Sequence, residues 1–272
     1  MRLIFLPENK RLVFYLAAEE YFNAHASRVV GMLKPSHLSG KKPEGVFFMW
    51  QSRPTVIFGR HQVMEAEVNI PYCQEQGIEM YRRKSGGGCV YSDEGNLMLS
   101  YISPSRHSQQ VFEQYLENVC EVLRSLGLPA VSTTHNDVLV DGRKVSGNAC
   151  LLTPHGTIVH GTLLLSSNVE VLQQAITPSE EKLGKHGVES VRQRVVTLEE
   201  LAEEMGREPF SLQQVQEAFI RHFCGARFGY FPSDEDLRAI REIERSYLDP
   251  TFIKGGPLSC PEGILPPEKE GA

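Results

Sequence analysis

Asp141-Gly142 lies between two short runs in which apolar and polar residues alternate. An Asp-Gly pair in this setting is the strongest short-range sign of a type I′ turn, which joins two neighbouring antiparallel strands. Leu139 and Val140 are then expected to pair with Lys144 and Val145 across the turn. This part of the chain is therefore predicted to form antiparallel sheet, with Lys144 held on a strand just beyond a tight turn.

The rest of the chain alternates between strand and helix patterns. Apolar runs at 46–50 and 55–59 flank a turn-like segment and predict a hairpin, and residues 89–91 and 96–102 predict a second strand pair. Helices gathered at the ends and late in the chain, around strands in the middle, indicate the α+β class rather than a regular βαβ order. Further strands are expected at 78–82 and 157–165, helices at 12–26, 69–77, 108–126, 168–176, 197–205, 211–223 and 233–247, and polar loops at 31–45 and 178–194.

Composition narrows the kind of partner. The 272 residues carry 28 basic and 34 acidic side chains, a formal net charge of −6, which argues against nucleic acid because duplex binding normally needs a basic face. The six cysteines form no CxxC pair, a pattern typical of a reducing compartment. The N-terminal pattern is not that of a signal peptide, and no apolar run approaches the roughly 20 residues of a membrane span. We therefore expect a soluble, cytoplasmic protein with no nucleic-acid and no membrane partner.

A second distinctive stretch is Arg82-Arg83-Lys84-Ser85-Gly86-Gly87-Gly88-Cys89-Val90-Tyr91, followed by Asp93 and Gly95-Asn96. Glycines lack a Cβ atom, so consecutive backbone N–H groups can approach an anion and form a concave nest around it. The three cations ahead of the glycines would add charged donors at the mouth of this nest. Their charge stands out from the acidic background and suits a small anionic ligand. A flexible hairpin turn is the alternative interpretation of the same glycines.

Several other residues each have two interpretations. Lys144 is either a solvated charge on a hairpin or an ammonium that holds a carboxylate or phosphate. His160 is either a core histidine or part of a site, and turn chemistry explains Asn136-Asp137 equally well. Cys89 and Cys150 are either small core residues or acyl-carrying nucleophiles. The only neighbours in sequence that would lower a thiol pKa are the cations at 82–84, which lie near Cys89. The P-loop and dinucleotide-binding motifs are absent, so a nucleotide would be held by another arrangement.

The glycine stretch resembles the RRxSGGGxVxxDxGN signature of the lipoate–protein ligase A family. The resemblance covers roughly residues 10 to 225 and consists of several blocks in order at sensible spacing, which is more specific than any single motif. The GRGRxGRxW-type motif of the related biotin ligases is missing. The further blocks are Leu16-Ala17-Ala18-Glu19-Glu20, Gly59-Arg60-His61-Gln62, Asn136-Asp137, Arg143-Lys144-Val145-Ser146-Gly147-Asn148-Ala149, His160-Gly161-Thr162-Leu163-Leu164-Leu165 and Ser190-Val191-Arg192-Gln193-Arg194-Val195.

This resemblance implies a fold and a reaction. The fold is a mixed, largely antiparallel sheet flanked by helices, as in biotin ligases and class II tRNA synthetases. In the reaction, lipoate and ATP give lipoyl-AMP and pyrophosphate, and the lipoyl group then passes to a lysine of an acceptor. The acceptors implied are lipoyl domains of 2-oxo acid dehydrogenase complexes or the glycine cleavage H protein.

The family pattern also implies roles for individual residues. Lys144 is the implied catalytic residue, contacting both the acyl carbonyl and the α-phosphate, and Asp137 would help to hold Mg²⁺ or the nucleotide. A tunnel for the lipoyl tail is expected to have apolar walls. The implied ATP or adenylate contacts are Arg83, Gly86, Gly87, Gly88, Cys89, Val90, Tyr91, Asn136, Asp137 and Lys144. The implied lipoate contacts are Ser85, Lys144, Gly147, Ala149 and His160, and the expected tunnel walls are Phe58, Val90, Leu97 and Leu99.

The chain departs from the family pattern toward its C-terminus. We expect a catalytic domain at 1–231, a helical extension at 232–254 and a disordered tail at 255–272. Full-length family members often carry a C-terminal accessory domain, for which the residues after 231 are too few. The expectation is therefore either a separately encoded small partner protein or catalysis of only part of the reaction.

Two alternatives to a ligase stay open. One is an ATP-independent transferase that moves octanoyl or lipoyl groups between carrier proteins through a thiol. The other is a non-catalytic protein that binds lipoyl-adenylate or a lipoyl domain. The presence of both Arg83 and Lys144 favours the ligase. Lipoate-dependent exchange between ATP and pyrophosphate distinguishes it from both alternatives.

Overall fold

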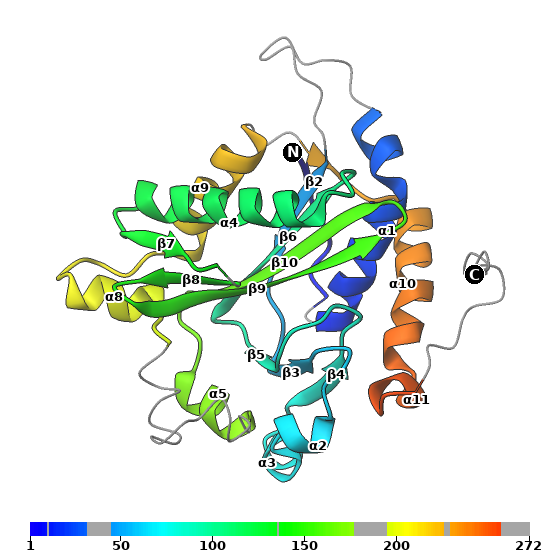
Figure 1. Cartoon of the computed structure of the whole chain (residues 1–272), viewed down its shortest axis with the longest axis horizontal. Helices are drawn as coiled ribbons and strands as arrows, with labels where there is room; N and C mark the ends of the chain where they lie inside the picture. The colour runs from blue at the N-terminus through cyan, green and yellow to red at the C-terminus, as the bar shows by residue number, and fades with distance from the viewer. Residues whose placement is uncertain (10, 32–44, 135, 177–194, 226–228, 257–272) are drawn as a thin grey trace, which may run out of the picture.

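The structure, a computed structural model, describes residues 1–9, 11–31, 45–134, 136–176, 195–225 and 229–256. These residues form two sheets and the helices around them (Figure 1). The strands are β1 (Arg2–Ile4), β2 (Val46–Trp50), β3 (Thr55–Phe58), β4 (Glu79–Arg82), β5 (Val90–Ser92), β6 (Asn96–Ser103), β7 (Ala130–Ser132), β8 (Asp137–Val140), β9 (Arg143–Thr153), β10 (Gly156–Leu164) and β11 (Gly229–Tyr230). The helices are α1 (Leu12–Gly31), α2 (Met64–Glu67), α3 (Ile70–Glu75), α4 (Ser108–Ser125), α5 (Val169–Ala175), α8 (Leu198–Glu204), α9 (Leu212–Cys224), α10 (Asp234–Leu248) and α11 (Pro250–Ile253). Within the described ranges, no helix is both long and apolar enough to cross a membrane.

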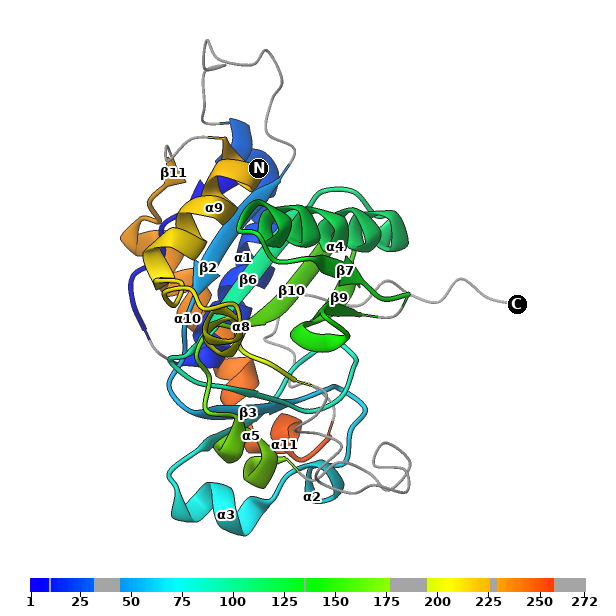
Figure 2. The same cartoon turned by 90° about the vertical axis from the view of Figure 1, so that its left-hand side faces the viewer.

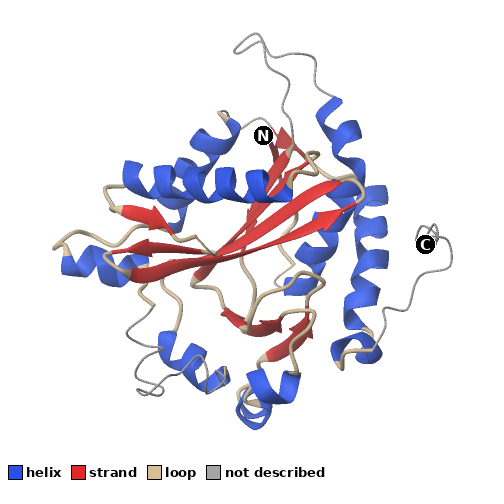
Figure 3. Ribbon diagram, in the orientation of Figure 1, coloured by secondary structure: helices blue, strands red, loops and turns tan. Residues whose placement is uncertain are grey.

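The larger sheet has eight strands in the order β11-β1-β2-β6-β10-β9-β8-β7. The two pairings of β1 are parallel, and the other pairings of this sheet are antiparallel. The smaller sheet has the order β4-β3-β5, and Figure 3 shows it as a separate layer below the larger one. The prediction of a mixed, largely antiparallel sheet flanked by helices is confirmed.

Helices cover both faces of the larger sheet (Figure 2). Side chains alternate along a strand, so the residues of β6 divide between the two faces. Leu97 and Leu99 pack into the core under α4 and α9, whereas Met98 and Ile102 pack into the core under α1 and α10. The second of these cores contributes the apolar part of the site described below.

The predicted turn at Asp141-Gly142 is confirmed, because both residues have positive φ angles, 49° and 75°, as a type I′ turn requires. Leu139 pairs with Lys144 as expected. Val140, however, pairs with Arg143 rather than with Val145, because a two-residue turn at 141–142 places the residues on either side of it opposite each other. The ladder then shifts between Val138 and Leu139, so Val138 pairs with Ser146 and Val145 has no direct partner in this ladder.

Two predicted strand pairs are wrong. Strands β2 and β3 do not form a hairpin, since β2 lies between β1 and β6 in the larger sheet while β3 lies between β4 and β5 in the smaller one. Strand β5 likewise pairs with β3, whereas β6 pairs with β2 and β10. These strands are buried on both faces, so their continuous apolar runs specify strand structure but not a partner.

The predicted helices that fall on described residues are present, and capping explains where several begin. Thr197, Ser211 and Ser233 each form a capping box. The side chain of the capping residue accepts from the backbone N–H of the third helical residue, whose own side chain accepts from the backbone N–H of the capping residue. Helix α1 continues to Gly31, beyond its predicted end at residue 26. Residues 32–44, 178–194 and 257–272, including most of the block 190–195 and of the predicted tail, lie outside the described residues.

Candidate functional site

The glycine loop, residues 85–88, connects the smaller sheet's strands β4 and β5. Gly87 has a φ of 91°, which favours glycine, and a Cβ atom on Gly59 would lie 2.0 Å from its carbonyl oxygen. Gly59 therefore lets the loop that follows β3 contact the glycine loop. There the N–H of Arg60 donates to the Ser85 carbonyl at 2.9 Å. No described residue accepts a hydrogen bond from the N–H groups of Gly87 or Gly88. These donors remain for a ligand.

Arg83 holds the shape of this loop from inside. Its guanidinium is buried and donates to the carbonyls of Gly86 at 2.7 Å and Gly88 at 2.8 Å, and also to the Ile57 carbonyl and the Ser85 hydroxyl. Burial lowers the pKa of Arg83 to about 10, so it stays charged at neutral pH. Binding the carbonyls turns them inward, which leaves the N–H groups of the loop for an anion.

The prediction that all three cations stand at the mouth of the nest is wrong for two of them. Arg82 points away and donates to the carbonyls of Arg60, Gln62 and two residues of α11. Lys84 instead forms an ion pair with Glu20 of α1, at 2.8 Å. Consecutive residues of an extended segment point in different directions, so a run of cations cannot converge on one ligand.

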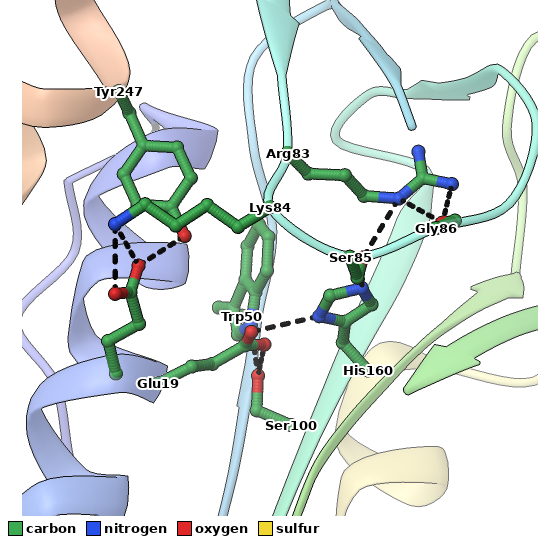
Figure 4. Close-up of polar contacts among 10 residues, drawn as sticks. Glu19, Trp50, Arg83, Lys84, Ser85, Gly86, Ser100, His160 and Tyr247 are labelled. Carbon is green, nitrogen blue, oxygen red and sulfur yellow. Dashed lines mark hydrogen bonds and ion pairs between the residues drawn. The ribbon is translucent and has the colours of Figure 1, made fainter. Parts of the chain in front are cut away.

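A chain of hydrogen bonds connects α1 to the glycine loop (Figure 4). The buried carboxylate of Glu19 lies 2.9 Å from Nδ1 of His160, and Nε2 of His160 lies 2.8 Å from the Ser85 hydroxyl. Ser100 also donates to Glu19 at 2.6 Å. Arg83 donates to Ser85 and Ser100 donates to Glu19, so every partner is satisfied when His160 donates from Nδ1 to Glu19 and accepts from the Ser85 hydroxyl at Nε2. Ser85 and His160 thus lie together as predicted.

Lys144 approaches from the opposite side, on β9. Its Nζ lies 2.7 Å from Oδ1 of Asp137, and both side chains are about one-third exposed. A Cβ atom on Gly147 would lie 2.8 Å from Lys144 Nζ, so glycine at that position leaves the room in which the lysine side chain lies. The Lys144 backbone is fixed, because its carbonyl accepts from the N–H of Val196 at 2.9 Å. The ammonium is therefore the movable part of a fixed strand.

Asn136 and Asn148 fasten the base of the same hairpin. Each side-chain amide donates to the backbone carbonyl of the other residue, at 3.1 Å and 3.0 Å. Asn136 therefore both borders the cavity and fixes the two strands that carry Asp137 and Lys144.

The two sides face one cavity of about 630 Å³. Glycine-loop residues Gly87 and Gly88 line it together with Asp137 and Lys144, so the loop and the ammonium meet in one space. The other predicted residues on its wall are Arg83, Cys89, Val90, Tyr91, Asn136, Gly147, Ala149 and His160. Ser85 and Gly86 do not line it, since Ser85 is buried behind His160 and Gly86 is turned outward.

Of the four expected tunnel walls, only Val90 lines the cavity. Leu97 and Leu99 face the opposite side of the sheet, and Phe58 packs in the core of the smaller sheet. The prediction that Leu97 and Leu99 form the tunnel wall is wrong, because the opposite face of β6 borders the cavity. Met98 is the residue of that strand on the cavity wall.

Other lining residues were missed by sequence reasoning. The apolar ones are Leu12, Leu16, Ile57, Met98, Leu139, Leu164, Leu172, Ile176 and Val195, and the polar ones include Glu67, Thr133, Asn148, Thr162 and Gln173. Leu12 and Leu16 are one helical turn apart on α1. This spacing predicts a buried helix face, but it does not indicate whether the core or a cavity lies next to that face. Glu67 and Gln173 stand on short helices of no distinctive composition, so their sequence carries no signal for this role.

The two candidate thiols are poor nucleophiles here. Burial, with a smaller contribution from the charge of Glu67, raises the pKa of Cys89 to about 12. Burial also raises the pKa of Cys150, which does not line the cavity. The thiolate is the reacting form, so neither cysteine is activated for acyl transfer.

The residues present fit a magnesium ion carried by a nucleotide. Among the described residues, no three His, Cys, Asp or Glu side chains cluster as an all-protein site. Asp137 supplies one carboxylate, and its Oδ1 accepts no well-directed hydrogen bond despite lying close to Lys144. Mg²⁺ is commonly held by one or two carboxylates together with substrate phosphates, which matches this donor set.

Comparison with known proteins places this site in a family. The catalytic domain of lipoyl protein ligases A and B matches residues 21–224. Lipoate-protein ligase LplJ of Bacillus subtilis is 33% identical over 77% of this chain and 63% of its own length. Lipoate–protein ligase 1 of Staphylococcus aureus is 32% identical over 74% of this chain and 61% of its own length. The chain thus spans about three-fifths of the length of these relatives.

Solved structures agree on the fold. A structure from Thermoplasma acidophilum, described as a bi-partite lipoate protein ligase and its E2 lipoyl domain, superposes with a TM-score of 0.74 and 25% identity. The match covers 93% of this chain and 96% of that one. A lipoate-protein ligase A bound with ATP, 23% identical, gives a TM-score of 0.73 over 93% of this chain and 98% of its own. This chain belongs to the lipoyl protein ligase A/B catalytic domain family.

Proposed function

We propose that the protein is a lipoate–protein ligase. It uses ATP to convert lipoate to lipoyl-AMP and then transfers the lipoyl group to a lysine of an acceptor domain. The observation that carries this proposal is the shared cavity, where the glycine loop and Lys144 face one another. The names of the related proteins, which are lipoate ligases, point to the same substrate.

The cavity has a polar and an apolar part that suit the two halves of lipoyl-AMP. Leu12, Leu16 and Met98 form an apolar wall from α1 and β6, where the lipoyl tail would lie. Gly87, Gly88 and Lys144 would face the phosphate and the activated carboxyl group. Ligand sites are commonly built this way, with an apolar lining and a few convergent polar groups.

In the first step a carboxylate oxygen of lipoate forms a bond to the α-phosphorus of ATP, and the bond to pyrophosphate breaks. Negative charge builds up on the phosphoryl oxygens, and the loop N–H groups and the Lys144 ammonium would stabilise it. Asp137 holds the ammonium in place before ATP binds. The magnesium ion would neutralise phosphate charge, and Asp137 is the residue that would hold it.

In the second step the amine of the acceptor lysine forms a bond to the acyl carbon, AMP leaves, and the amine loses a proton. Lys144 lines the cavity, and its ammonium would stabilise the oxyanion that forms on the acyl oxygen. The acceptors would be lipoyl domains of 2-oxo acid dehydrogenase complexes or the glycine cleavage H protein. We also propose that a separate small partner protein takes part, and the description of the Thermoplasma ligase as bi-partite supports a second component.

Lipoate-dependent exchange of radioactive pyrophosphate into ATP tests the first step, and modification of an apo lipoyl domain tests the second. We expect both activities from the purified protein with Mg²⁺. Exchange without transfer would restrict the function to activation. Acyl transfer from a carrier protein without any exchange would show the thiol-dependent transferase instead, against the raised thiol pKa values.

A further inference from the structure

The C-terminal helices α10 and α11 hold the segment that precedes the glycine loop. Arg82 is buried, and its Nε donates to the carbonyls of Phe252 at 3.0 Å and Ile253 at 3.1 Å. These carbonyls are at the C-terminal end of α11, and the Phe252 carbonyl also accepts from the N–H of Gly255 at 3.0 Å. The same guanidinium donates from Nη1 to the Gln62 carbonyl at 2.7 Å. Arg82 therefore joins α11 to the strand that leads into the loop.

Two residues further on, Lys84 makes a second connection, to α10 (Figure 4). Its Nζ lies 2.8 Å and 2.9 Å from the two carboxylate oxygens of Glu20, and 4.6 Å from the centre of the Tyr247 ring. The Tyr247 hydroxyl donates to Glu20 at 2.5 Å. Tyr247 is 2% exposed, and burial next to Glu20 raises the pKa of its hydroxyl well above the usual value. Side chains from three separate segments thus meet at one partly buried contact, in which only Tyr247 is fully buried.

We propose that Tyr247 and the end of α11 position the glycine loop for nucleotide binding, which makes Tyr247 a positioning residue of the reaction proposed above. Arg82 and Lys84 stand on either side of Arg83, whose guanidinium binds the carbonyls of Gly86 and Gly88. Fixing the two neighbours fixes the backbone from which Arg83 reaches the loop. The direction of the loop N–H groups then depends on residues 234–253, although Tyr247 and α11 do not line the cavity.

The other end of α10 provides an internal control. Buried Asp236 accepts from the hydroxyls of Tyr21 and Tyr230, each at 2.5 Å, and also from Arg28. Tyr21 lies on α1, as Glu20 does, so this cluster joins the same two helices as the Tyr247 contact. No hydrogen bond or ion pair of the described residues connects it to the glycine loop.

The test compares Tyr247→Phe with Tyr21→Phe in the full chain. Each substitution removes one hydroxyl that donates to a carboxylate at 2.5 Å in the α1–α10 interface. Tyr247→Phe should raise the KM for ATP in lipoate-dependent exchange about tenfold while kcat changes less, because the loop is no longer held ready. It should also speed amide hydrogen exchange at 82–91 in the protein without ligands. Tyr21→Phe should lower Tm by a similar amount and change neither of these quantities.

Equal effects of the two variants on the KM for ATP and on exchange at 82–91 would overturn the proposal, as would wild-type values for Tyr247→Phe. If Tyr247→Phe does not fold, Lys84→Gln takes its place with the same expected results. The two proposals can fail separately. A wild-type protein without ligase activity would contradict the proposed function. Hydrogen exchange needs no turnover, so it would still test whether Tyr247 positions the loop.

Discussion

The two sides of the cavity are built in opposite ways. The glycine-loop side is held by buried groups, and Arg82, Arg83 and Ser85 are each less than 5% exposed and hydrogen-bonded. The hairpin side presents to the cavity the ion pair Asp137–Lys144, with both side chains about one-third exposed. In the proposed reaction the loop binds phosphate through its backbone and has to be fixed beforehand, whereas the Lys144 ammonium would leave Asp137 to follow the reacting groups. We therefore predict that substitutions on the glycine-loop side lower the free energy of unfolding, whereas substitutions on the hairpin side lower the reaction rate.

Lys144→Ala should have the largest effect. Losing one preorganised group that stabilises transition-state charge costs about 10²–10³ in rate, or about 3–4 kcal/mol. Because an exposed ion pair contributes only about 0–1 kcal/mol to folding, Tm should stay close to the wild-type value. Lipoate-dependent pyrophosphate exchange and thermal unfolding measure the two quantities. Exchange at the wild-type rate would remove Lys144 from the site.

Arg83→Lys should show the reverse pattern. A lysine has three donors and cannot reproduce the planar fork that serves Ile57, Ser85 and the loop carbonyls, so buried acceptors lose their partners. We expect a loss of about 2–3 kcal/mol in the free energy of unfolding, measured by urea denaturation. Arg143→Lys is the matched control, since Arg143 makes only an exposed ion pair with Glu204 and should change stability little. Equal losses in both variants would show that the loop is not held by Arg83.

Glu19→Gln should have an intermediate effect. The buried carboxylate accepts from both His160 and Ser100, and the neutral amide keeps at most weaker versions of these bonds. We expect a loss of about 1–2 kcal/mol in stability and a several-fold higher KM for lipoate, because His160 borders the cavity. The exposed pair Glu121–His222 offers a control, and Glu121→Gln should leave both values unchanged. No change on Glu19→Gln would mean that the orientation of His160 does not depend on this carboxylate.

Asp137→Asn should have the smallest effect on stability, within about 0.5 kcal/mol, since the pair is partly exposed. It removes the carboxylate expected to hold the magnesium ion, so the Mg²⁺ concentration for half-maximal exchange should rise several-fold. A titration of activity against Mg²⁺ measures this shift. An unchanged requirement for Mg²⁺ would assign Asp137 only to holding Lys144.

The sequence predicted the site better than it predicted the sheet around it. Asp141-Gly142 specifies its own turn. Motif blocks in a fixed order pointed to Lys144, Asn136 and His160, and all three line the cavity, although their roles stay predictions. Strand partners depend on contacts between distant residues. The buried runs at 46–50 and 55–58 look alike in sequence yet belong to different sheets.

The remaining errors have the same physical origin. A single residue of register decides which side of β6 faces the cavity, so Met98 and not Leu97 lines it. The directions of Arg82 and Lys84 depend on contacts with Phe252 of α11 and Tyr247 of α10, each more than 160 residues away in sequence. No local pattern at 82–84 records that contact.

The central claim is that the glycine loop and Lys144 hold one activated acyl phosphate. Hydrogen exchange measured with and without a non-hydrolysable lipoyl-AMP analogue tests it most directly. We predict slower exchange in both 82–91 and 142–149, to a similar extent and at the same analogue concentration. Protection of only one of the two segments, or of neither while the analogue is bound, would contradict the claim.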